Sequence, residues 1–173
     1  LMDYRQVQGQ FDRIVSVGMF EHVGVAQFEA YFGKVKELLT DDGLALLHSI
    51  GRKGGPGQTG AWVRRYIFPG GYSPALSETL QSIERTGLWV TDIEILRLHY
   101  AKTLRMWEER FQSHRSAIAE MMDERFCRMW EFYLIASELA FSHGKHMNFQ
   151  IQLTKDVRAA QLTRDYMFEN EKR

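Results

Sequence analysis

Apolar residues along this chain change repeatedly from short continuous runs to helical spacing. Residues 11–18 contain a β-branched apolar run that Gly18 ends, which is typical of a buried strand. Apolar side chains then recur at helical spacing from Val25 to Leu39, which predicts an amphipathic helix. A strand followed through a short turn by such a helix is the βα unit of an α/β protein.

The remaining pattern continues this alternation. We predict further strands over residues 44–50, 90–98 and 147–154. Residues 62–68 form a short amphipathic piece, and further helices are predicted over residues 74–85 and 103–140. The second of these helical segments is expected to be broken near Ser113 and near Asp123. The Asp41-Asp42-Gly43 segment is expected to end the first helix, with Gly43 in the left-handed conformation.

Three segments lack a regular pattern. The glycine-rich residues 53–60 predict a loop or lid. Residues 1–4 are expected to be the end of a strand whose beginning is missing. Residues 156–173 are charged and weakly patterned, which predicts a frayed helix or tail.

Composition restricts the class of protein. Lys plus Arg equals Asp plus Glu at 22 each, which argues against a general nucleic-acid surface. No apolar run approaches the roughly 20 residues of a membrane span, and no signal peptide is visible. The single cysteine, Cys127, leaves no disulfide framework and favours a reducing, cytoplasmic setting. We expect it to be a buried, inert thiol, and no closed ligand set predicts a metal site.

Polar side chains follow three of the predicted strands. They are Glu21 with His22, His48, and His99 with Tyr100. Because the carboxyl ends of parallel strands lie on one edge of a sheet, these groups can converge. A carboxylate, an imidazole and a phenol could hold a small anion or position a base. The alternative is that each is a hydrogen-bonded polar residue that closes a strand end.

The chain contains no G-x-G-x-x-G or P-loop pattern. A nucleotide-binding fold ordinarily carries its glycine turn after the first strand. Either the protein binds no such cofactor, or the first strands of the sheet are missing.

Five motifs carry a resemblance to a known family. They are FDRIVSVGMFEHVG, LLHSIG, YIFPGGYSP, LHYAKTLRMWEERF and FYLIASELAF, spread from Asp3 to Lys155. They resemble the cyclopropane-fatty-acid synthase family, which includes the mycolic acid cyclopropane synthases. The resemblance implies the α/β fold of a class I S-adenosylmethionine methyltransferase, with strand order 3-2-1-4-5-7-6 and an antiparallel seventh strand.

On this basis the chain is the C-terminal half of a Rossmann-like sheet, with strands in the order 4-5-7-6 and helical lid insertions. Residues 1–155 would belong to the catalytic domain and residues 156–173 would form a charged tail. The N-terminal half, with its glycine-rich cofactor loop, would be missing, so we expect this chain alone to be inactive.

The resemblance also implies an activity. The family transfers a methyl group from S-adenosylmethionine to the cis double bond of a phospholipid acyl chain; the resulting cation then loses a proton and a cyclopropane ring closes. A bound bicarbonate is the implied proton acceptor. The positions matched to it are Glu21, His48, Tyr100 and Ser137, and those matched to the cofactor are Tyr4, Arg5, Val17 and Gly18.

Glu138 admits two interpretations. Its carboxylate either faces solvent or pairs with a cation such as Arg105 or Arg128, or it reaches the strand edge and replaces bicarbonate as the catalytic base. Two other functions also stay open: methylation of the acyl chain without ring closure, and a non-catalytic lipid-binding remnant. The resemblance further implies a cytoplasmic enzyme at the inner face of the membrane, acting on unsaturated phospholipid acyl chains, with a homodimer as one option.

Overall fold

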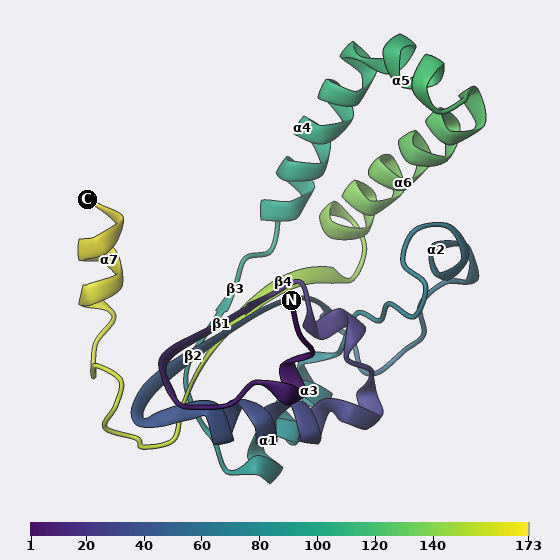
Figure 1. Ribbon diagram of the computed structural model, residues 1–173. Coiled ribbons are helices and arrows are strands. Elements are labelled where there is room, and N and C mark those ends of the chain that lie inside the picture. The colour runs from purple at the N-terminus through teal and green to yellow at the C-terminus, as the bar shows by residue number, and fades with distance from the viewer. Residues whose placement is uncertain (173) are drawn as a thin grey trace.

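The computed structural model describes residues 1–172 and contains one four-stranded sheet within them (Figure 1). Its strands lie in the order β1 (Phe11–Val17), β2 (Leu39–Arg52), β4 (His146–Thr154), β3 (Trp89–Ile95). β1 and β2 are parallel, whereas β4 is antiparallel to both β2 and β3. The predicted strand order, with the last strand in sequence antiparallel, is therefore confirmed.

One face of the sheet carries the main hydrophobic core. Two helices, α1 (Phe28–Leu38) and α3 (Leu76–Thr86), lie along this face beneath the strands (Figure 1). Alternate residues of β4, from Met147 to Leu153, are buried against them, as their period of two predicts. Of the intervening residues, Gln150 and Gln152 are half-buried, whereas Asn148 is fully buried.

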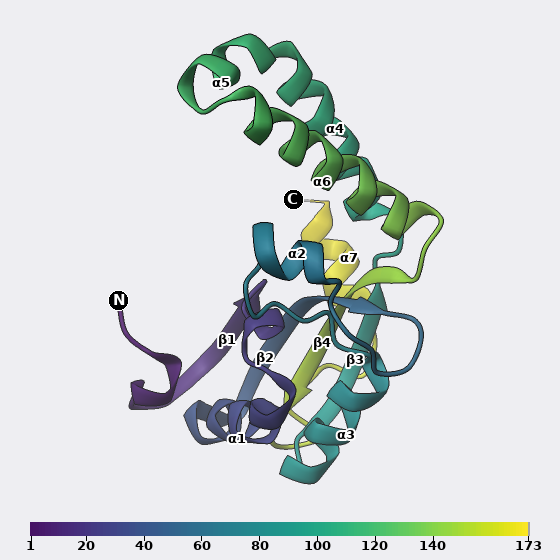
Figure 2. The ribbon, with the colours of Figure 1, turned by 90° about the vertical axis from the view of Figure 1, so that its right-hand side faces the viewer.

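A helical arm extends beyond one end of the sheet (Figure 2). It consists of α4 (His99–Ser113), α5 (Arg115–Met121) and α6 (Glu124–Ser142). Both predicted breaks are confirmed. α4 ends at Ser113, and Asp123 caps α6 by accepting a hydrogen bond from the Phe126 amide at 2.6 Å. The arm has its own core, which contains the fully buried Cys127.

The prediction for Asp41-Asp42-Gly43 is wrong. α1 already ends at Leu38, and the segment lies inside β2, where Gly43 does not have a positive φ. Leu39 is completely buried and extended, so burial of its side chain turns the chain directly from helix into strand. The pairing with β1 then jumps from Leu39 to Leu44, which accommodates the acidic segment as an irregularity of the strand.

The two termini also differ from expectation. Residues 1–3 are not in a strand, and η1 (Tyr4–Gln6) is a 3₁₀ turn capped by the side chain of Asp3. Near the other end, α7 (Asp165–Glu171) is preceded by Arg164, whose Nε lies 2.5 Å from an Asp92 carboxylate oxygen. The predicted tail is thus partly helical and contacts β3; Arg173 lies outside the described residues.

The glycine-rich loop leads into α2 (Ala61–Tyr66), a short helix beside the arm. Among residues 1–172, no helix is both long enough and apolar enough to cross a membrane.

Candidate functional site

The turn after β1 places Glu21 next to β2. This turn, η2 (Phe20–His22), is fixed because Phe20 is fully buried and stacks on Phe28 with ring centroids 4.2 Å apart. Glu21 Oε1 then accepts a hydrogen bond of 2.6 Å from the backbone amide of Ile50. Glu21 Oε2 is buried and has no hydrogen-bond partner in the described part of the chain. This second oxygen can therefore accept a hydrogen bond from a ligand.

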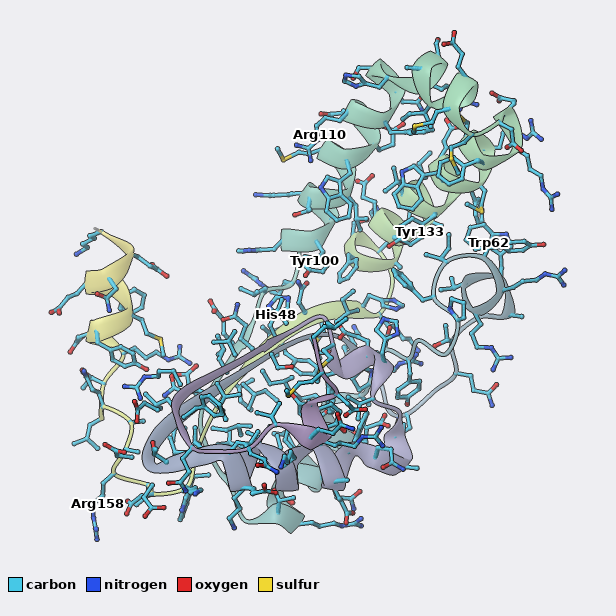
Figure 3. All side chains as sticks on the ribbon, in the orientation of Figure 1. His48, Trp62, Tyr100, Arg110, Tyr133 and Arg158 are labelled. Carbon is cyan, nitrogen blue, oxygen red and sulfur yellow. The ribbon has the colours of Figure 1, made fainter. Side chains whose placement is uncertain are left out.

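His48 and Tyr100 meet across the junction of sheet and arm. Nε2 of His48 lies 3.0 Å from the Tyr100 hydroxyl oxygen, and Figure 3 shows Tyr100 at the base of the arm next to His48. His48 does not end its strand, because β2 continues to Arg52, and Tyr100 belongs to the first turn of α4. The expected convergence of His48 and Tyr100 nevertheless occurs. His99 is exposed and has no side-chain hydrogen bond to either of them.

The surroundings hold both side chains in their neutral forms. Burial lowers the pKa of His48, and the negative charge of Glu21 only partly opposes this. Burial raises the pKa of Tyr100, and the charge of Glu21 raises it further. Near neutral pH the cluster therefore offers an uncharged imidazole and a protonated phenol, both able to donate a hydrogen bond.

Glu138 pairs with the arm rather than with His48 or Tyr100. Arg105 donates to Glu138 Oε1 from Nε at 3.0 Å and also from Nη2. Glu138 is only 16% exposed, so the guanidinium supplies the partner that a nearly buried carboxylate requires. Within residues 1–172, no hydrogen bond joins Glu138 to His48 or Tyr100.

Ser137 is next to Glu138 on α6. Burial raises the pKa of Tyr133, and the nearby Ser137 hydroxyl opposes that rise. Among the described residues, no hydrogen bond joins the Ser137 side chain to His48 or Tyr100.

The four residues matched to the cofactor lie along the β1 edge and the preceding turn. Val17 is 61% exposed, and Gly18 has a φ of +65° with open space where a Cβ would lie. The Gly18 amide donates to the His48 carbonyl at 3.2 Å, which joins this edge to the cluster. Tyr4 packs edge-on against Tyr31, and Arg5 pairs with Asp3 at 2.7 Å.

An apolar groove lies between α2 and the start of α6. It encloses about 850 Å³ and is lined mainly by aromatic, methionine and arginine side chains: Trp62, Tyr66, Met122, Asp123, Arg125, Phe126, Arg128, Met129 and Phe132. The sequence pattern did not predict it, because its two walls are far apart along the chain. The exposure of Phe132 and Tyr66, at 55% and 41%, marks it in the structure.

A row of ring contacts connects the groove with the turn that holds Glu21. His22 contacts Phe68 with centroids 5.9 Å apart, and Phe68 contacts Tyr133 at the same distance. Tyr133 contacts Trp130 at 5.1 Å, and Trp130 stacks on Phe126 of the groove at 6.1 Å. In Figure 3, Tyr133 lies between Tyr100 and Trp62.

Known proteins share this arrangement of elements. The family model for mycolic acid cyclopropane synthetase matches residues 1–151. The chain belongs to this family. The resemblance carried by the five sequence motifs is thereby confirmed.

Three relatives illustrate the relationship. A probable fatty acid methyltransferase from Pseudomonas putida is 43% identical over 152 residues, which cover 83% of this chain and 38% of the relative. The cyclopropane-fatty-acyl-phospholipid synthase of Escherichia coli is 40% identical over 157 residues, covering 91% of this chain and 41% of the synthase. Mycolic acid cyclopropane synthase CmaA1, solved in complex with SAH and CTAB, superimposes with a TM-score of 0.79 at 28% identity. That match covers 87% of this chain and 57% of the synthase.

The chain thus spans about two fifths of the length of these two curated relatives. Its fold is that of the corresponding part of a class I methyltransferase.

Proposed function

We propose that this chain forms the acceptor side of an enzyme that methylates the cis double bond of an unsaturated phospholipid acyl chain and closes a cyclopropane ring. The observation that carries the proposal is the cluster of Glu21, His48 and Tyr100. It combines a buried carboxylate oxygen that lacks a partner with a neutral imidazole and a protonated phenol that contact each other.

The cluster suits a small anion with one hydroxyl group. Tyr100, which lies beside the His48 imidazole, can donate to a negatively charged oxygen, and Glu21 Oε2 can accept from a hydroxyl. Bicarbonate has these donor and acceptor requirements, and when bound it would supply a proton acceptor beside the acyl chain. We assign this role to bicarbonate rather than to Glu138, since the ion pair with Arg105 supports a structural role for that carboxylate. Ser137 remains a further candidate contact.

The groove supports a lipid as the substrate. Its volume and aromatic lining are those of a site for an apolar ligand. The ring contacts from Phe126 to His22 give an acyl chain an apolar path toward the cluster. Arg125 and Arg128 at the groove suit the phosphate of a headgroup, which would place this part of the protein at a membrane surface.

The exposed β1 edge supports S-adenosylmethionine as the methyl donor. The cofactor supplies an electrophilic methyl group on a sulfonium. Val17 and Gly18 would contact it where the strand ends next to His48, and Tyr4 and Arg5 would flank it. The open backbone at Gly18 fits the close approach of a ligand.

Analysis of the lipids made in cells that express the protein tests the proposal. The longest natural polypeptide that contains this sequence is expressed in cells rich in unsaturated phospholipids, and the acyl chains are analysed by mass spectrometry and proton NMR. A ring and a methylated alkene have equal masses, so the cyclopropane protons in the NMR spectrum decide between them. An alkene product would favour methylation of the acyl chain without ring closure. Unmodified lipids with retained vesicle binding would indicate a non-catalytic lipid-binding protein.

A further inference from the structure

Gln150 lies directly opposite His48 in the sheet. The two residues are register partners in the antiparallel pair of β2 and β4, so their side chains project from the same face. Gln150 Nε2 lies 3.3 Å from His48 Nδ1. The residues on either side of Gln150, Phe149 and Ile151, are fully buried on the opposite face and fix the strand in this register.

This contact determines where the imidazole carries its proton. With the Gln150 amide oriented so that Nε2 faces the ring, the amide nitrogen can only donate, so His48 Nδ1 accepts and carries no proton. A neutral imidazole then has its proton on Nε2, which lies 3.0 Å from the Tyr100 oxygen. Nε2 therefore donates to Tyr100, and the hydroxyl proton of Tyr100 is directed to a third group.

The opposite tautomer would remove this donor from the site. With the proton on Nδ1, Nε2 of His48 would accept the Tyr100 hydroxyl proton. The cluster would then present the Tyr100 oxygen and the Glu21 carboxylate, which are both acceptors, and it would repel an anion. The orientation of the Gln150 amide thus decides whether the cluster can donate a hydrogen bond to an anion.

We propose that Gln150 is a positioning residue that keeps the proton of His48 on Nε2 and so leaves the Tyr100 hydroxyl free to donate to a bound anion. The identity of that anion as bicarbonate rests on the proposed function. The hydrogen bond between the two strands is independent of it.

The chain offers a matched control in Gln152. It lies two residues further along β4, on the same face and half-buried. Its amide donates to Thr91 at 3.1 Å and accepts from Tyr166 at 2.8 Å, and it has no hydrogen bond to His48. A substitution there disturbs the same strand without changing the imidazole.

The test reads the tautomer directly. The longest natural polypeptide that contains this sequence is labelled with ¹⁵N-histidine, and long-range ¹H–¹⁵N correlation spectra assign the protonated nitrogen of His48. We expect Nε2–H in the wild type and in Gln152→Leu. An ionised carboxylate only accepts hydrogen bonds, so at a pH where the imidazole is neutral Gln150→Glu should move its proton to Nδ1. Titration with ¹³C-bicarbonate should show an affinity about tenfold or more weaker in Gln150→Glu and Gln150→Leu, from loss of one hydrogen bond to a charged ligand.

The outcomes separate the two ideas. A wild type with Nδ1–H, or a Gln150→Glu variant that folds and keeps Nε2–H, overturns the positioning role. Unchanged bicarbonate affinity in both Gln150 variants overturns it as well. If the tautomer shifts as expected while the wild type binds no bicarbonate, the positioning role stands and the proposed anion is wrong. Thermal unfolding of each variant identifies any that fail to fold. If one of the two Gln150 variants does not fold, the bicarbonate affinity of the other still tests the positioning role.

Discussion

Replacing Tyr100 with phenylalanine tests the candidate site with little disturbance of the fold. The substitution removes the hydroxyl that lies 3.0 Å from His48 Nε2 but keeps the ring, which packs edge-on against Phe141 with centroids 5.5 Å apart. His48 is 8% exposed, so its Nε2–H group loses its partner at a largely buried position. Leaving such a donor without a partner lowers the free energy of unfolding by about 1–3 kcal/mol.

That loss is too small to unfold the protein. Domains are stable by about 5–15 kcal/mol, so a loss of about 1–3 kcal/mol leaves most molecules folded. A hydrogen-bond donor that stabilises negative charge in an active site has a much larger effect on turnover than on folding, so we expect kcat to fall roughly a hundredfold. The affinity for S-adenosylmethionine should stay nearly unchanged, because Tyr100 is not among the residues proposed to contact it.

The assay measures transfer of a labelled methyl group from S-adenosylmethionine to vesicles of unsaturated phospholipid, with cofactor affinity determined by calorimetry. Tyr166→Phe is the matched control, because it also removes a hydroxyl hydrogen bond from a half-buried tyrosine, here to Gln152 at 2.8 Å. Equal losses of kcat and cofactor affinity in Tyr100→Phe would refute the reasoning, as would a turnover equal to that of Tyr166→Phe.

Three further predictions concern the groove, the ion pair and the histidines. Trp62→Ala should raise the apparent KM for the lipid, since Trp62 lines the groove and its ring centroid lies 4.8 Å from that of Phe132. Trp89→Ala, at an exposed position on β3, is the control. Equal KM values in the two variants would argue against a lipid groove. Arg105→Ala should lower the free energy of unfolding by about 1 kcal/mol, because the guanidinium is exposed and partly screened. A double-mutant cycle with Glu138→Gln measures the interaction energy of the Arg105–Glu138 pair. Loss of ring formation in Glu138→Gln alone would return the role of catalytic base to Glu138. Burial lowers the pKa values of His48 and His146, so their contribution to stability is present above the ordinary pKa of about 6.5 and is lost as the pH falls toward the lowered pKa values. Urea unfolding at several pH values should show this loss of stability. The loss should be smaller in His48→Gln and in His146→Gln.

The sequence was sufficient where one local signal determined the structure. The period of two in β4 identified its buried face, and Asp123 marked the start of α6 because a side-chain cap depends only on residues nearby. The prediction that the Asp41-Asp42-Gly43 segment ends the first helix was wrong because burial of Leu39, a tertiary effect, outweighed the local helix-stop signal. Propensity is a weak guide where core packing competes with it.

The site residues show the same division. Glu21 and His48 could be named because they belong to recognisable motifs. Gln150 could not, since its importance depends on the register between β2 and β4, and a shift of one residue would place it on the other face. The pairing of Glu138 with Arg105 was foreseen as one of two alternatives, and only the arrangement of α4 against α6 distinguishes it.

The candidate site joins two separately packed parts of the chain. His48 lies on the sheet, whose core contains Phe149 and Ile151, whereas Tyr100 packs against the core of the arm. The hydrogen bond between His48 and Tyr100 therefore spans the junction, and its length depends on how the arm sits on the sheet. Gln150 fixes the imidazole from the sheet side, so the phenol is the partner whose position the arm controls. A ligand that fills the groove between α2 and α6 would contact the same arm that carries Tyr100, which gives lipid binding a direct physical route to the geometry of the anion cluster.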